Sequence, residues 1–246
     1  MGPSSARHSA AWITSLLVAA LLLGPGGAAA QASSGAVQDQ FWPEIDYYQS
    51  LSKVSRLLFQ ALAATGANDV ADNAQFGVNL DLFLKPRSIY KPLAVGAASL
   101  VDDRYHPYML RLGYRYTEPV NGSSTAIQNR LLAEFSVKYN FFGAFTAERN
   151  SFDWRWTNGV YSTRYRNRVY SEYPIDIDKY QLTPYAQSEW FYNLTKGAWA
   201  GVQYEAGVQL PVFRHVTTSV YLARQNNWGT SQPDQVAIGL TVTLSY

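Results

Sequence analysis

From residue 41 onward, apolar and polar residues alternate along most of the chain with a period of two. Segment 108–117 shows the pattern clearly, because its even positions are all Tyr or Leu and its odd positions include two Arg, one Gly and one Thr. Successive side chains of a β-strand point to opposite faces, so one face of such a strand suits lipid and the other suits water. No segment sustains the spacing of an amphipathic helix. The chain is therefore predicted to be all-β.

The alternating segments predict eleven strands of 9 to 14 residues. These lengths exceed the ~5–6 residues usual in globular sheets and approach the ~9–11 residues of a tilted membrane-spanning strand. The predicted strands are 41–50, 55–65, 76–84, 108–117, 126–138, 144–156, 160–170, 185–193, 197–210, 216–225 and 235–246. Single-chain antiparallel barrels normally contain an even number of strands. We therefore expect a single antiparallel up-and-down transmembrane β-barrel of 12 strands, with 93–101 as the twelfth, or of 10 strands with one early segment outside the wall. A soluble β-sandwich is the competing fold, but it gives no reason for apolar residues to face outward so uniformly.

Two Asn-Gly pairs predict tight hairpins, since a type I′ turn needs positive φ at both central residues. For Asn158-Gly159, the residues predicted to lie opposite one another are Arg155 and Ser162, Asp153 and Arg164, and Trp156 and Tyr161. For Asn121-Gly122 they are Arg115 and Gln128, Leu112 and Leu131, and Tyr108 and Phe135. The faces assigned to each strand separately agree across both hairpins, which supports the two registers.

Composition favours a membrane location for this sheet. Asp, Glu, Lys and Arg make up only 15% of the chain, and aromatic residues make up another 15%, whereas soluble domains are usually ~25% charged. Mean hydropathy is −0.19, and beyond residue 25 no apolar run approaches the length of a transmembrane helix. The net charge is +2, with acidic and basic residues interleaved, which argues against nucleic-acid binding. Cys is absent, so disulfides, thiolate metal sites and cysteine nucleophiles are excluded.

Residues 1–30 resemble a signal peptide, with Arg7 near the start, an apolar stretch over 10–23, and small residues at the end. Cleavage is expected after Ala30 or Ala32, and the apolar stretch is short for a membrane anchor. Residues 31–40 then form a flexible leader, and 41–246 form the barrel as one domain.

Charged residues of the predicted strands share one face, which we assign to the lumen. The predicted lumen residues are Asp81, Arg111, Arg115, Arg130, Glu134, Arg149, Asp153, Arg155, Arg164, Arg166, Arg168, Glu189 and Glu205. Two interpretations stay open: a salt-bridged network that fills a narrow barrel, or an arginine-rich constriction that favours anions. Arg168 is predicted to lie opposite Arg149, so we expect Glu189 to approach the arginines from the neighbouring strand. The predicted lipid face carries aromatic residues that suit an interfacial girdle or, alternatively, a sugar-binding stripe: Trp154, Trp156, Tyr161, Trp190 and Tyr192.

The last predicted strand places alternate apolar residues and a terminal aromatic on one face: Ile238, Leu240, Val242, Leu244 and Tyr246. Such an ending resembles the sorting signal that outer-membrane barrels present to their assembly machinery. Several segments, in their order and spacing, resemble a bacterial outer-membrane family known as domain of unknown function 2490. They are Trp42-Pro43-Glu44, Leu112-Gly113-Tyr114-Arg115-Tyr116, Asn129-Arg130 with Glu134, Arg164-Tyr165-Arg166-Asn167-Arg168, and Pro184-Tyr185 with Glu189-Trp190-Phe191-Tyr192.

The resemblance covers residues 40–246 and implies a porin-like barrel in the outer membrane of a Gram-negative bacterium. It implies outer-membrane lipid and the barrel assembly machinery as partners, and it transfers no catalytic residue.

Candidate catalytic chemistry is sparse. His106 follows Asp102-Asp103, and the turn Asn121-Gly122-Ser123-Ser124 contains two hydroxyls, but neither forms a recognisable nucleophile setting. His215 lies at a predicted strand end, and His8 lies in the signal peptide. We assign no catalytic residue, metal or cofactor. Three functions remain: a structural barrel, a narrow channel for small solutes of unknown identity, or a lipid-modifying hydrolase with its site at one rim.

Overall fold

The structure, a computed structural model, describes residues 37–65, 71–84, 106–120, 126–177, 180–229 and 233–246. The predicted signal peptide, most of the leader, the twelfth strand at 93–101, Asp102-Asp103 and the turn at 121–124 lie outside these residues. The described residues contain no helix with the length and apolarity of a membrane span.

All elements of the described residues are β-strands, as predicted from the alternation. The strands are β1 (Gln38–Ser52), β2 (Ser55–Thr65), β3 (Ala71–Leu84), β4 (Tyr108–Pro119), β5 (Gln128–Phe141), β6 (Ala144–Thr157), β7 (Val160–Glu172), β8 (Ile175–Ile177), β9 (Tyr180–Asn193), β10 (Ala198–Phe213), β11 (Val216–Asn227) and β12 (Gln235–Ser245). β1 begins at Gln38, so the predicted leader is too long by three residues, because the alternation extends backward through Gln38 and Gln40.

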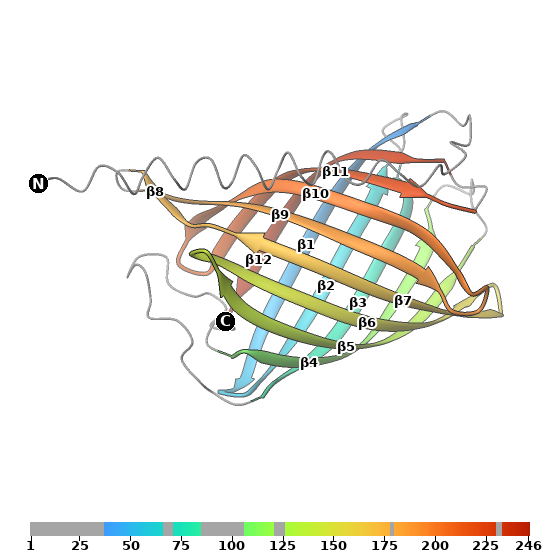
Figure 1. Cartoon of the computed structure of the whole chain (residues 1–246), viewed down its shortest axis with the longest axis horizontal. Coiled ribbons are helices and arrows are strands. Elements are labelled where there is room, and N and C mark those ends of the chain that lie inside the picture. The colour runs from blue at the N-terminus through green and yellow to red at the C-terminus, as the bar shows by residue number, and fades with distance from the viewer. Residues whose placement is uncertain (1–36, 66–70, 85–105, 121–125, 178–179, 230–232) are drawn as a thin grey trace, which may run out of the picture.

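The strands form a closed barrel in which each strand is tilted and pairs with its neighbours in the sequence (Figure 1). β10 pairs with both β9 and β11, and β12 pairs with β1, which closes the ring. The β12–β1 pair is parallel, from Gln38 opposite Gln235 to Tyr48 opposite Ser245. All other wall pairs are antiparallel.

The strand count differs from the predicted 12 or 10. Among the described residues, eleven strands close the barrel, and these are the eleven segments that the alternation identifies. The additional short strand, β8, pairs only with β9 and extends its end. Strands that alternate in direction can close a ring only in even numbers, so an eleven-stranded ring requires one parallel pair. The parallel β1–β12 pair meets this requirement, and the expectation of a fully antiparallel wall was wrong at this one seam.

The register predicted for the β6–β7 hairpin is confirmed. Asn158 and Gly159 have φ of 49° and 80°, as a type I′ turn requires. Asp153 lies opposite Arg164, and Trp156 lies opposite Tyr161, with their rings 5.4 Å apart.

The register predicted for β4–β5 is wrong by two residues. Arg115 lies opposite Arg130 instead of Gln128, and Tyr108 lies opposite Val137 instead of Phe135. The connection between these strands is longer than a two-residue hairpin, so Asn121-Gly122 does not set the pairing. A shift of two residues preserves the faces, because side chains alternate with a period of two.

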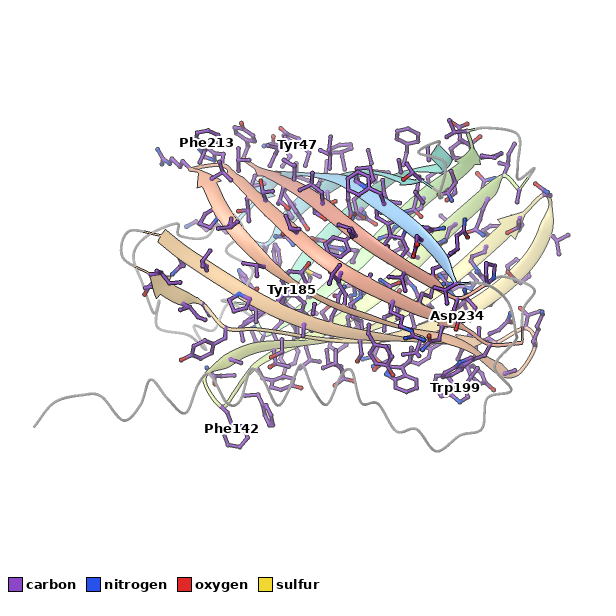
Figure 2. The ribbon with its side chains drawn as sticks, turned by 90° about the horizontal axis from the view of Figure 1, so that it is seen from above. Tyr47, Phe142, Tyr185, Trp199, Phe213 and Asp234 are labelled. Carbon is purple, nitrogen blue, oxygen red and sulfur yellow. The ribbon has the colours of Figure 1, made fainter. Side chains whose placement is uncertain are left out.

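The outer face of the wall is apolar, and aromatic residues gather toward both rims. Figure 2 shows Phe142 and Phe213 at one end of the barrel and Trp199 at the other. Trp199 packs edge-on against Trp190 and Tyr192. Exposed apolar strands with aromatic rims are typical of barrels that sit in a bilayer.

Candidate functional site

Carboxylates on the inner face of β3 and β5 hold arginines of the neighbouring strands. Asp81 accepts hydrogen bonds from Arg56 Nε at 2.7 Å and from Arg111 Nε at 2.6 Å. Glu134 lies 3.9 Å from Arg111 Nη1 and 3.3 Å from Arg149 Nε. A continuous chain of opposite charges thus runs across β2 to β6.

A second group of ion pairs lies on β6, β7 and β9. Asp153 accepts hydrogen bonds from Arg164 Nη2 at 3.1 Å and from Arg166 Nη2 at 2.9 Å. Glu189 accepts from Arg166 Nη1 at 3.0 Å and from Arg168 Nη2 at 2.8 Å. Glu189 therefore approaches the arginines of β7 as the sequence predicts.

These pairs are deeply buried, since the side chains of Asp81 and Asp153 are 0% exposed. Buried ions require paired, hydrogen-bonded partners, and removal of one partner leaves a costly isolated charge. Arg149 and Arg168 lie directly opposite one another, but each has its own carboxylate, Glu134 and Glu189. This part of the interior therefore behaves as a structural network.

Three other predicted lumen arginines form a row without carboxylates. Arg115 lies opposite Arg130, and Arg130 lies opposite Arg155, so they occupy adjacent strands β4, β5 and β6. Within the part of the chain that the structure describes, no carboxylate oxygen lies within 4.0 Å of their guanidinium groups. Like charges directly opposite one another destabilise a sheet. We call these three residues the arginine row.

Neutral amide oxygens position two members of the arginine row. Gln60 Oε1 accepts a hydrogen bond from Arg115 Nη2 at 3.0 Å. Gln128 Oε1 accepts from Arg130 Nη2 at 2.7 Å and from Arg130 Nε at 3.2 Å. These contacts fix the guanidinium groups without neutralising them.

An acidic pair on β1 lies on the other side of Gln60. Gln60 Nε2 donates to Glu44 Oε1 at 3.2 Å and to Asp46 Oδ1 at 3.0 Å. Gly77 lies between Gln60 and Arg115 in the register, and a Cβ there would approach Arg115 Cγ to 3.3 Å. The missing side chain thus lets Arg115 reach across β3, and one glutamine separates the arginine row from the acidic pair.

Glu205, also predicted to line the lumen, has a different environment. Its carboxylate accepts hydrogen bonds from Tyr185 Oη at 2.8 Å and from Gln187 Nε2 at 2.7 Å. These donors are neutral, so Glu205 does not belong to the ion-pair network. Nearby, the ring of Tyr221 covers Gly239, where a Cβ would lie 1.9 Å from Tyr221 Cζ.

The histidines do not form a catalytic cluster with the described residues around them. The ring of His106 stacks on Phe83, with centroids 4.9 Å apart. His215 Nδ1 lies 2.7 Å from the carbonyl oxygen of Ser245, and its ring stacks on Tyr246. Tyr246 also hydrogen-bonds through its backbone to Tyr48 and Ser50 of β1. The described residues contain no group of three or more side chains suited to hold a metal ion.

Sequence reasoning did not assign Glu44, Asp46 and Gln60 to the lumen, although Glu44 belongs to a segment that carries the family resemblance. A usable signal was present, because Gln40, Glu44 and Asp46 share one parity within β1 while Phe41 and Ile45 share the other. Assigning the polar parity of β1 and β2 to the lumen places all three inside.

The family of this chain follows from its sequence as well as its fold. The family model described as "Protein of unknown function (DUF2490)" matches residues 107–236, which include the arginine row and most of the ion pairs. The chain belongs to this family. The predicted family is thereby confirmed, over a shorter range than the predicted 40–246, because the segment Trp42-Pro43-Glu44 lies outside the match. A search among curated proteins returns no match.

Solved structures show what fold this family member has. The structure of the NanC porin superposes with a TM-score of 0.52 at 11% identity, covering 86% of this chain and 100% of that chain. OmpT of Vibrio cholerae, an outer membrane protein, gives a TM-score of 0.31 at 10% identity, covering 80% of this chain and 91% of that chain. The NanC comparison shows that the chain has a porin-like β-barrel fold.

Proposed function

We propose that the chain is exported and inserts into the bacterial outer membrane as a barrel. The apolar outer face, the aromatic rims and the porin-like fold support this location. Barrel protein from detergent extracts is expected to migrate differently on gels before and after boiling, and to sediment with outer membranes. Recovery of the chain from the soluble periplasm would contradict the proposal.

Within that location, we propose a narrow channel for small solutes. The observation that carries the proposal is the separation of the arginine row from the acidic pair of Glu44 and Asp46 by Gln60. Segregated charge on two parts of a lumen creates a field across it, and charged rings in a pore select ions. A barrel with only a structural role would gain stability from pairing these charges, as it does at Asp81 and Asp153.

Planar bilayer recordings test this function directly. The purified barrel is expected to conduct ions. In a salt gradient, replacing Arg115, Arg130 and Arg155 together by Gln is expected to shift the reversal potential in the direction of greater cation permeability. Arg224, which is exposed and hydrogen-bonded to Asn226, provides the control substitution Arg224→Gln. Absence of conductance in the unsubstituted protein would refute the channel and leave the structural barrel, which the buried ion-pair network favours.

A further inference from the structure

We infer that the arginine row is a binding site for small solutes that carry two acidic groups, such as dicarboxylates. The inference rests on the proposed channel and names what its lumen recognises. The first observation is that the three arginines lie side by side on β4, β5 and β6 with no carboxylate of the described residues within 4.0 Å. The row carries three positive charges and lacks anions of its own.

The row also has unused hydrogen-bonding capacity. The Nε atoms of Arg115 and Arg155 are buried and have no hydrogen-bond partner in the structure. The guanidinium group is planar and donates to carboxylates in pairs, through hydrogen bonds stronger than neutral ones. An incoming carboxylate would pair with the accessible part of each guanidinium group, which has no carboxylate of the described residues beside it.

Preorganisation distinguishes this row from charges that merely fill space. Gln60 and Gln128 hold Arg115 and Arg130 through neutral oxygens, and Gln128 is itself anchored by donating to Thr157 Oγ1 at 3.0 Å. Such contacts reduce the entropy that binding must overcome. All three arginines are only partly buried, so a solute in the lumen can reach them.

The spacing of the row favours two acidic groups over one. Neighbouring strands lie ~4.8 Å apart, so the backbones under Arg115 and Arg155 are separated by about 10 Å. One carboxylate contacts one or two guanidinium groups at this spacing, whereas two acidic groups on a short chain can engage all three.

Isothermal titration of the purified barrel in detergent tests the inference with succinate, butyrate and inorganic phosphate as probes. Succinate and butyrate have the same number of carbon atoms, so they differ chiefly in the second acidic group. We expect succinate to bind more tightly than butyrate and phosphate. Arg130→Gln is expected to weaken succinate binding at least about tenfold, the loss expected for a charge-assisted hydrogen bond, while Arg224→Gln leaves it unchanged.

Thermal unfolding separates a binding role from a structural one. Removing Arg130 relieves repulsion within the row, so Arg130→Gln is expected to unfold at the same or a higher temperature than the unsubstituted barrel. A lower unfolding temperature in this variant would assign the row to structure and overturn the inference. Equal affinity for succinate and butyrate, or tighter binding of phosphate, would overturn the assignment to two acidic groups.

Failure of the inference is distinguishable from failure of the channel. Conductance without succinate binding retains the channel and refutes the binding site. Succinate binding without conductance supports the site and refutes the channel.

Discussion

Glu189 on β9 binds Arg166 on β7, with 3.0 Å between Oε1 and Nη1. The other oxygen of the same carboxylate binds Arg168, so one buried acid compensates two cations on one strand. Glu205 lies on the neighbouring strand β10, two residues beyond Gln203, which is opposite Glu189. Its carboxylate is held by the neutral side chains of Tyr185 and Gln187. The two glutamates are therefore matched in type but not in electrostatic role.

Glu189→Gln is expected to destabilise the barrel more than Glu205→Gln. The first substitution removes one of the two carboxylates that pair with buried Arg166 and the carboxylate that pairs with half-buried Arg168, at a cost of about 3–5 kcal/mol. The second weakens hydrogen bonds between neutral donors and one acceptor, at about 1–3 kcal/mol. Urea unfolding of both variants in lipid vesicles, followed by tryptophan fluorescence, measures the difference. Equal losses of unfolding free energy would contradict the distinction.

Deletion of Tyr246, or replacement of both Leu244 and Tyr246 by Asp, is expected to block assembly into the membrane. Leu240, Val242, Leu244 and Tyr246 are proposed to form the signal read by the assembly machinery. Charged side chains near the interface of such barrels cost at most about 1 kcal/mol, so loss of sorting is expected to exceed loss of stability.

Two measurements separate these effects: the amount of each variant in outer-membrane fractions, and its refolding from urea into detergent. Normal membrane levels of the double variant would count against the signal. A variant that neither sorts nor refolds would show that Tyr246 acts through its packing on His215 and Tyr47.

Gly239→Ala is expected to destabilise the barrel, whereas Gly77→Ala is expected to have a smaller effect. A Cβ at Gly239 would overlap the ring of Tyr221. A Cβ at Gly77 would meet the flexible chain of Arg115 at 3.3 Å and otherwise make ordinary contacts at 3.6 Å or more. Overpacking in a filled interior costs about 1–3 kcal/mol. Comparison of the urea midpoints of the two variants tests the difference, and a larger effect at Gly77 would be unexpected.

Gly159→Ala is expected to cost about 1–2 kcal/mol, because an L-residue with a Cβ is disfavoured in the left-handed region. Gly159 has φ of 80°, and no atom lies near a Cβ placed there. The loss would thus come from backbone conformation alone. Refolding kinetics of this variant show whether the hairpin also limits the folding rate.

Alternation is sufficient to predict the eleven wall strands, but it does not identify the short strand β8. Alternation persists through most of each wall strand, and the interruptions lie near the ends of β1, β2 and β10. The Asn158-Gly159 turn fixes the register of the β6–β7 pair, because only two residues connect these strands. Sequence reasoning fails where that link is lost, as at β4–β5, where a longer connection shifts the pairing of Arg115 by two residues.

Closure of the ring could not be predicted in the same way. The β1–β12 pair joins the two ends of the barrel sequence, and no short turn records its direction. The contacts of the arginine row depend in the same way on distant strands, since Arg115 reaches Gln60 across Gly77. Parity places these side chains in the lumen, whereas their partners depend on the three-dimensional register.

The parallel pairing of β1 and β12 places the start of β1 and the end of β12 at opposite rims of the barrel. Gln38 is beside Gln235 at one rim, and Tyr48 is beside Ser245 at the other. A small epitope inserted before Gln38 and another attached after Tyr246 would therefore face opposite sides of the membrane. In a barrel with an even number of strands, both epitopes would face the same side. Antibody access to intact cells with one label and then with the other would thus distinguish the two topologies.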